Sequence, residues 1–168
     1  TENHDQNAWE GTQYERFGVG LDNAIVLSFV GEGIPLIYNG QEAGNDRRLK
    51  FFEKDPITWR SHKNDALFKK LITFRDAHPA LWNAPWGATM TPVVNTAPGK
   101  VLSFVREKDG DKILALFNMS GTEQSFSFTD GPTVGVYHDF ADGSAVAIAS
   151  DGNISMPAWS YKILAAKR

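Results

Sequence analysis

The stretch from Gly33 to Glu42 reads Gly-Ile-Pro-Leu-Ile-Tyr-Asn-Gly-Gln-Glu, and it decides how the first half of the chain is interpreted. Its apolar part, Ile34–Tyr38, has the length of one short strand. A nearly continuous apolar run of that length is typical of a strand that is buried on both faces. We therefore predict a buried strand here, followed by a long loop, Asn39–Lys63.

A helix is predicted on each side of this strand. Before it, Leu21–Val30 is apolar along most of its length and is stopped by Gly31. After the long loop, apolar residues from Leu67 to Phe74 recur at helical spacing until Pro79 ends the pattern.

Two further expectations complete the first half of the chain. Asn64 or Asp65 is expected to cap the second helix, because both side chains accept hydrogen bonds from unpaired helix N–H groups.

Thr1–Asp5 is expected to be the end of another strand, followed by a polar loop. The order strand, helix, strand, helix, with a long loop after a strand, is typical of a β/α barrel. Two strands cannot close a barrel, so only part of one is predicted.

The pattern of apolar and polar residues changes near Pro85. After it, short alternating strands are separated by turns, which is the pattern of an antiparallel sandwich or barrel. Lys108-Asp109-Gly110-Asp111 is the clearest hairpin turn. We predict a mixed α and β fold in which residues 1–85 belong to a partial (β/α)8 barrel and residues 86–168 form an antiparallel β-sandwich domain. Strands are expected at Ala88–Val94, Val101–Glu107, Lys112–Asn118, Thr122–Phe128, Val134–His138, Ala145–Ile148 and Ser160–Ala165.

Composition argues against several classes of function. The chain has 168 residues, of which 42% are hydrophobic, and this marks an ordered globular protein. Its net charge of −3 comes without a basic stripe, so a nucleic-acid partner has no electrostatic support. It has no cysteine, which removes disulfides, thiolate nucleophiles and cysteine-ligated zinc. No stretch approaches the roughly 18 apolar residues of a membrane span, so none is expected.

The residues Asn3-His4-Asp5 are the first candidates for chemistry. A histidine beside an aspartate could form a general-base pair, could supply two metal ligands, or could belong to a solvated chain terminus. Neighbouring side chains on a strand point to opposite faces, so His4 and Asp5 converge only where a strand ends. These residues alone leave the three interpretations open.

Several motifs, taken in order, resemble the α-amylase family of glycoside hydrolases. The run Glu2-Asn3-His4-Asp5 is followed by a polar loop, a helix and the Gly33–Glu42 stretch. A second helix then ends in Phe74-Arg75-Asp76-Ala77-His78-Pro79-Ala80-Leu81. The predicted sandwich matches the usual C-terminal domain of this family in position and size. The resemblance implies that the first half of the chain holds the last two β/α units of the catalytic barrel.

The resemblance also implies roles for individual residues. Asp5 would be the third catalytic carboxylate of the family, which orients the sugar hydroxyls and stabilises the cationic transition state. His4 would hydrogen-bond the sugar in the reacting subsite. A carboxylate that is already in place favours the positive charge that grows on the sugar ring as the glycosidic bond breaks.

Further sugar contacts are implied by the loop after the predicted strand. Relatives offer an aspartate and an arginine to the neighbouring glucose from this loop, so Asp46 and either Arg47 or Arg48 are candidates. The alternative is that both arginines are only solvated. Glu42 could be structural or could face the substrate. Trp9 could stack on a sugar ring or could pack against the protein.

The resemblance also indicates what this segment does not hold. A retaining glycosidase needs a carboxylate nucleophile and a carboxylic acid about 5 Å apart. In the family both come from the fourth and fifth strands, which have no counterpart in this sequence. The calcium ligands of the family also lie mostly upstream, so we expect no cofactor in this segment and calcium only in an intact enzyme. The chain by itself is expected to be inactive.

The predicted function is therefore that of the C-terminal portion of a retaining α-glucan hydrolase. Its substrate would be an α-glucan or maltooligosaccharide, and its partner would be the N-terminal part of its own barrel. A transglycosylase of the same family shares every motif seen here. The alternative from another class is a non-enzymatic β-sandwich module that binds glycan or stabilises the barrel, and coplanar exposed aromatic rings on one sheet face would support it.

Overall fold

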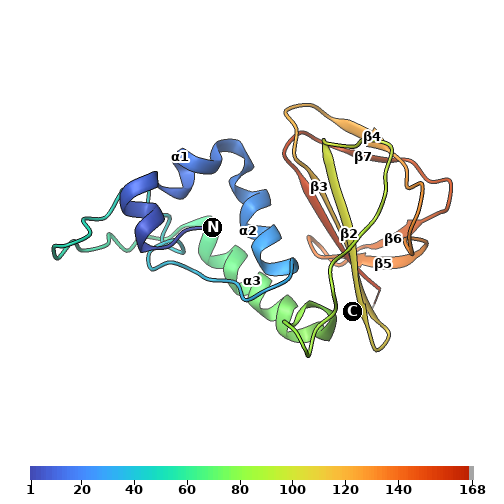
Figure 1. Ribbon diagram of the computed structural model, residues 1–168, viewed down its shortest axis with the longest axis horizontal. Coiled ribbons are helices and arrows are strands. Elements are labelled where there is room, and N and C mark those ends of the chain that lie inside the picture. Colours follow the sequence, from blue (N-terminus) through green and yellow to red (C-terminus); the bar gives the residue numbers. More distant parts are fainter. Residues whose placement is uncertain (167–168) are drawn as a thin grey trace.

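The chain folds into a helical part and a part made of strands, and a long loop projects from the helical part (Figure 1). Figure 1 is a computed structural model in which residues 1–166 are described. No helix among these residues is both long and apolar enough to cross a membrane.

The helical part contains α1 (Gln13–Phe17), α2 (Leu21–Val30) and α3 (Lys63–Ala77). α2 has the predicted bounds, and it ends at Gly31, whose N–H donates to the carbonyl of Leu27. Three short helical turns accompany these helices: η1 (Gln6–Glu10) precedes α1, η2 (Gly18–Gly20) connects α1 to α2, and η3 (Pro79–Leu81) follows α3.

The second predicted helix, α3, is also present, but its N-cap differs from the prediction. His62 caps the helix, because its Nδ1 accepts a hydrogen bond from the N–H of Asn64 at 3.2 Å. Asn64 is fully buried, and its side-chain amide donates to the carbonyl of Gln41 at 2.9 Å. The prediction of Asn64 or Asp65 as the cap is therefore wrong, because it ignored a partner that lies far along the chain.

Neither of the two strands predicted in the first half is present. Thr1–Asp5 has no strand and leads into the turn η1, and Ile34–Tyr38 has no regular structure. A parallel strand needs neighbours that complete its ladder of hydrogen bonds, and within residues 1–166 no strand pairs with either segment. Ile34 and Leu36 are consequently 79% and 57% exposed, although a buried sheet was expected. The sheets of the described residues are open and form no closed barrel.

The second half forms the antiparallel sheets that the alternating pattern predicts. Its strands are β1 (Thr91–Pro92), β2 (Val101–Lys108), β3 (Asp111–Asn118), β4 (Gln124–Phe126), β5 (Gly135–Asp139), β6 (Ala145–Ile148), β7 (Ile154–Met156) and β8 (Tyr161–Ala165). Six of them pair in the order β1-β2-β3-β8-β5-β6, and β4 pairs with β7 in a second sheet. The predicted hairpin is confirmed, because Asp109 and Gly110 both have positive φ between the paired residues Lys108 and Asp111.

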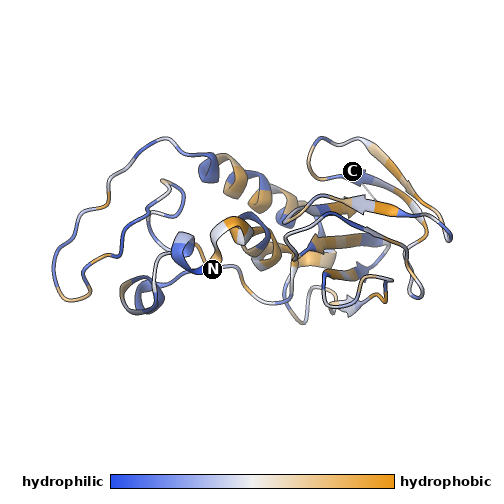
Figure 2. Ribbon diagram, turned by 90° about the horizontal axis from the view of Figure 1, so that it is seen from above, coloured by the Kyte–Doolittle hydropathy of each residue, from blue (hydrophilic) through white to orange (hydrophobic). Residues whose placement is uncertain are grey.

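The central strand β3 of the six-stranded sheet is buried on both faces. Ile113, Ala115 and Phe117 of β3 belong to the core that the sheet shares with α2 and α3. Leu114 and Leu116 of the same strand belong to the core between the two sheets. This alternation follows from the period of two in a strand. The layers are therefore helices, large sheet and small sheet, and hydrophobic residues gather where helices meet strands (Figure 2).

A buried arginine joins the helical part to the large sheet. Arg106 of β2 is 1% exposed, and its guanidinium donates to backbone carbonyls at the end of α2 and around η3. The predicted domain boundary near Pro85 lies close to this joint. One hydrophobic core contains residues from both sides of the boundary, so the division into two domains stays a prediction. The carbonyls that accept from the arginine are those of Val30, Gly31, Leu81, Trp82 and Ala88.

Candidate functional site

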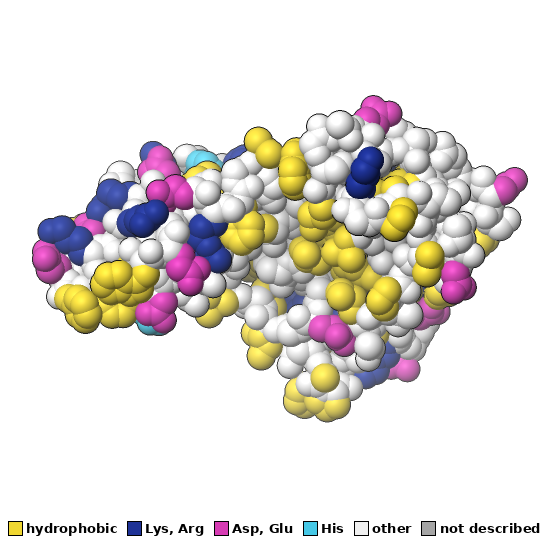
Figure 3. Space-filling model, turned by 45° about the horizontal axis from the view of Figure 1, so that its top comes forward, with side chains coloured by type: hydrophobic (Ala, Val, Ile, Leu, Met, Phe, Trp, Pro, Cys, Tyr) yellow, Lys and Arg dark blue, Asp and Glu magenta, His cyan; other side chains and the backbone are white. Residues whose placement is uncertain are grey.

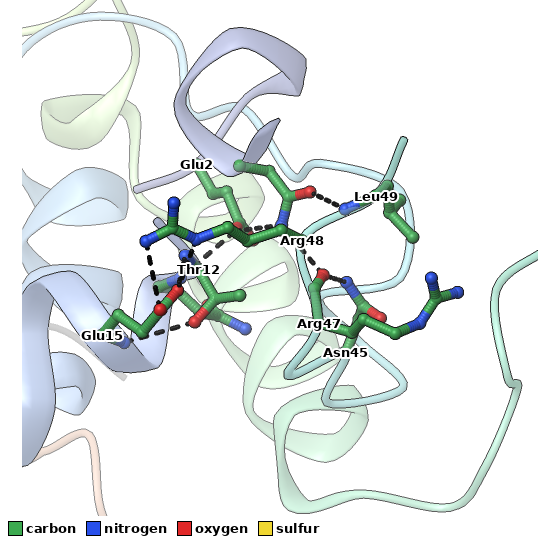
Figure 4. Close-up of polar contacts among 9 residues, drawn as sticks. Glu2, Thr12, Glu15, Asn45, Arg47, Arg48 and Leu49 are labelled. Carbon is green, nitrogen blue, oxygen red and sulfur yellow. Dashed lines mark hydrogen bonds and ion pairs between the residues drawn. The ribbon is translucent and has the colours of Figure 1, made fainter. Parts of the chain in front are cut away.

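Buried polar side chains join the start of the chain to the long loop between α2 and α3 (Figure 4). Glu2 is 2% exposed, and its Oε1 accepts hydrogen bonds from the Asn7 amide at 2.8 Å and the Gln13 N–H at 3.1 Å. Asn7 in turn accepts from the N–H of Leu49 at 2.7 Å and donates to the carbonyl of Arg47 at 3.3 Å. Asn7 therefore holds the long loop against the first residues of the chain.

Gln41 makes a second connection between the same two segments. It is 1% exposed, and its side-chain nitrogen donates to the hydroxyl of Thr1 at 2.8 Å and to the side-chain oxygen of Gln13 at 2.9 Å. Its Oε1 accepts from the N–H of Tyr38 at 2.7 Å. Burial raises the pKa of the nearby Glu2 carboxyl, and the hydrogen bonds that Glu2 accepts act in the opposite direction.

The predicted catalytic pair lies on the surface at this end of the molecule. His4 Nε2 is 3.5 Å from Asp5 Oδ2, and the two side chains are 65% and 61% exposed. Both residues lie in the helical turn that leads into η1, so they do not follow a strand as expected. The Asp5 side chain makes no capping hydrogen bond to this turn. Its carboxylate is therefore accessible to a ligand.

Both candidate arginines form ion pairs within the chain. Arg47 Nη1 lies 2.6 Å from Asp55 Oδ2. Arg48 donates two hydrogen bonds of 3.1 Å to the carboxylate of Glu15 (Figure 4). The Arg48 guanidinium, together with the N–H of Thr12, lowers the pKa of Glu15 to about 2. The two guanidinium groups are thus held in place, and both remain about half exposed.

The third candidate of the loop, Asp46, lines a small cavity. Its carboxylate lies 3.1 Å from Arg60, whose hydrogen bond lowers the pKa of Asp46. The cavity has a volume of about 190 Å³, and Asn45, Arg47 and Thr58 complete its lining. Because charged, amide and hydroxyl groups surround it, the cavity can hydrogen-bond a polar ligand.

Trp9 lies beside two phenylalanines of the long loop. Its ring centroid is 5.4 Å from that of Phe51 and 6.3 Å from that of Phe52. The ring of His4 stacks on Phe51 with a centroid distance of 5.6 Å. Trp9 therefore packs against the protein on one side and is 61% exposed, so part of its ring is accessible to a ligand.

Sequence motifs did not indicate most of the residues that assemble this site. Asn7, Gln13 and Gln41 are neutral amides, and their partners lie up to 42 residues away. Glu42 accepts a hydrogen bond from the N–H of Gly40 at 3.0 Å, which gives it a structural role in the turn. Local patterns carry no signal for such contacts, because the partners are known only once the chain is folded.

The described residues do not form a metal centre. Within residues 1–166 there is no group of three or more His, Asp or Glu side chains that could hold a metal ion. Beside Asp5 the structure places the ring of His4, and this pair does not supply the six to eight oxygen ligands that calcium takes.

Sequence comparison relates the chain to α-amylases. No protein-family model matches the chain. Over 156 residues it is 29% identical to α-amylase 2 of Dictyoglomus thermophilum, a match that covers 85% of this chain and 25% of that protein. The chain thus spans about a quarter of the length of the curated relatives it matches.

Solved structures with a similar fold include α-amylases. The maltogenic α-amylase of Thermotoga neapolitana has a TM-score of 0.78 at 22% identity, and the match covers 98% of this chain and 40% of that one. The α-amylase of Geobacillus thermoleovorans, solved in complex with acarbose, has a TM-score of 0.69 at 17% identity and is matched over 99% of this chain and 38% of its own. The chain is therefore similar in sequence to α-amylases of the glycoside hydrolases, and its fold matches the C-terminal part of solved α-amylase structures.

Proposed function

We propose that the chain is part of a retaining glycoside hydrolase that cleaves α-glucosidic bonds in starch or related oligosaccharides. The observation that supports this function is the buried joint through Asn7, which connects residues 40 apart in sequence. It ties the segment that carries the His4–Asp5 pair to the loop that carries Asp46 and its cavity. An extended sugar chain can contact both.

In this proposal Asp5 acts as the third catalytic carboxylate and His4 hydrogen-bonds the sugar in the reacting subsite. Positive charge develops on the sugar ring as the glycosidic bond breaks, and a carboxylate that is fixed beside the ring lowers the energy of that state. Among the described residues, His4 is the only ion-pair partner of Asp5. The carboxylate is thus available to the ligand instead of being used to hold the fold.

Asp46 and one arginine are proposed to contact the neighbouring sugar. Both arginines are paired, Arg47 with Asp55 and Arg48 with Glu15, but Arg47 lines the cavity beside Asp46 and Arg48 does not. This difference favours Arg47 as the residue that reaches the sugar. Trp9 offers a partly open ring face on which a sugar can stack. We propose that calcium in an intact enzyme is held outside this segment.

The proposal is tested by comparing this chain with a longer protein that contains it. The chain alone is expected to release no sugar from soluble starch, because the nucleophile and the acid are proposed to lie on other strands of the barrel. The longer protein is expected to cleave maltooligosaccharides and to release the α-anomer first, because retaining enzymes use two displacements. Proton NMR in the first minutes of reaction distinguishes the anomers. Initial release of the β-anomer, or turnover by the chain alone, contradicts the proposal.

A further inference from the structure

The junction between the helical part and the strands carries hydrophobic side chains at the surface, as the face in Figure 3 shows. A groove of about 940 Å³ opens in this junction, between α3 on one side and the turn from β5 to β6 on the other. Pockets of about 300–1,000 Å³ with a mostly apolar lining are usual for small organic ligands. None of the residues that line the groove belongs to the proposed sugar site.

The lining of the groove favours an aromatic ligand. Phe140 and Ala165 are buried there, and Phe74 lines the α3 side, so an apolar ligand is removed from water when it binds. The ammonium of Lys70 lies 4.6 Å from the centroid of Phe140 and donates to the carbonyl of Ala141. A cation at the groove attracts the face of an aromatic ring and has no such attraction to an aliphatic chain.

A buried histidine of the lining has a ring nitrogen without a partner. His78 is 5% exposed, and its Nδ1 lies 2.8 Å from Asp111 Oδ1. Asp111 Oδ2 accepts from the N–H of Ala80 at 2.9 Å, so both carboxylate oxygens act as acceptors and Nδ1 carries a hydrogen. Within residues 1–166, Nε2 of His78 makes no hydrogen bond. In a neutral imidazole this nitrogen is an acceptor, so it can bind a hydroxyl of a ligand.

The charged side chains of the lining favour an uncharged ligand. Two lysines and two aspartates line the groove, so their charges cancel. Asp139 is satisfied inside the protein, because its oxygens accept from Lys162 Nζ at 2.6 Å and from the N–H of Ala141 at 2.9 Å. Lys69 pairs with Asp65 at 2.7 Å. A ligand with a net charge therefore finds no excess of opposite charge in the groove.

We propose that this groove binds a phenol, an uncharged aromatic molecule whose hydroxyl donates to Nε2 of His78. Its ring packs against Phe74, Phe140 and Ala165 beside the ammonium of Lys70. A sugar carries a hydroxyl on nearly every carbon, whereas the buried side chains of the lining offer one unpaired polar atom in the described part of the chain. The inference is independent of the proposed function, because it uses neither the catalytic pair nor the long loop.

Titration of this chain with p-cresol, followed by ¹H–¹⁵N NMR, tests the groove directly. The backbone signals of Phe74, Phe140 and Ala165 are expected to shift. The methyl ether of p-cresol has the same ring but no hydroxyl hydrogen, so it is expected to bind about three- to tenfold more weakly, which is the effect of one hydrogen bond. The anion p-toluate is expected to bind no more tightly than the ether.

His78→Asn separates the ligand's hydrogen bond from the fold. The asparagine amide can still donate to Asp111, but the variant has no Nε2, so p-cresol and its ether are expected to bind with equal affinity. Ala77→Trp fills the groove from an exposed position of α3 and is expected to weaken p-cresol binding about tenfold or more. Ala66→Trp is the matched control, because Ala66 is exposed on the same helix outside the groove, and its affinity is expected to equal that of the unchanged chain.

Equal affinity of the unchanged chain for p-cresol and its ether, tighter binding of p-toluate, or p-cresol binding that Ala77→Trp leaves intact overturns the phenol site. Maltose that shifts the same signals at equal concentration also overturns it, because the groove then belongs to a sugar. If His78→Asn does not fold, the comparison of p-cresol with its ether and the Ala77→Trp variant still decide. Sedimentation shows whether the groove joins two copies of the chain instead, and a dimer that Ala77→Trp dissociates contradicts the site as well.

Discussion

At the scale of single residues, Glu15 connects a helix start to the site. Its Oε2 accepts from the N–H of Thr12 at 2.7 Å, and the Thr12 hydroxyl accepts from the N–H of Glu15, which forms a capping box at α1. The same carboxylate accepts two hydrogen bonds from Arg48. One side chain therefore positions both the first helix and the loop that carries the candidate sugar contacts.

This geometry predicts a pH-dependent effect of Glu15→Gln. The pKa of Glu15 is lowered from 4.5 to about 2, so its charged form stabilises the folded chain. That contribution is present above pH 4.5 and is lost as the pH falls towards about 2. We expect the variant to be less stable than the unchanged chain at pH 7 and to match it near pH 2, as measured by urea unfolding. Glu53→Gln, which removes only an exposed pair with Lys50, is the control. A stability difference that does not change with pH contradicts the prediction.

At the scale of elements, the contacts of Arg106 in β2 connect the stability of the helical part to the large sheet. Its side chain satisfies the carbonyls at the end of α2, which have no partner within the helix. Arg106→Met leaves these buried carbonyls unpaired, and we expect it to lower the free energy of unfolding by about 3 kcal/mol or more. Lys100→Met changes an exposed residue and is expected to stay within about 0.5 kcal/mol. Equal unfolding midpoints for the two variants in urea contradict the role of Arg106.

Comparing the predicted with the observed helices and strands shows which elements can be predicted from the sequence. α2 is confirmed because its apolar residues and its glycine stop are local signals. The strands of the sandwich alternate in the predicted places, but β7 is only three residues long and was missed. Ile34–Tyr38 has the pattern of a buried strand and forms none, because strand pairing depends on neighbours elsewhere in a fold. Local pattern is sufficient for a helix and insufficient for a parallel strand.

At the scale of the whole molecule, one end is formed by the first residues and the long loop, the other end by the two sheets, and a helix–sheet core joins them. The resemblance to a family indicated His4 and Asp5, and the fold places them at the loop end with Asp46. The network through Asn7 that assembles this end could not be predicted, because buried amides acquire their partners only through the tertiary fold. The roles of these residues towards a sugar stay predictions.

Asp5→Asn in a longer protein that contains this chain separates catalysis from folding. The Asp5 carboxylate has only His4 as its ion-pair partner in the described part of the chain and makes no capping bond, so the midpoint of thermal unfolding is expected to stay the same. The kcat for a maltooligosaccharide is expected to fall about a hundredfold or more, because a charge that stabilises the transition state is removed. Asp151→Asn, at an exposed turn of the sandwich, is expected to change neither value. Hydrolysis by the Asp5→Asn protein at a nearly unchanged kcat would contradict the assignment of Asp5 to a sugar-cleaving site.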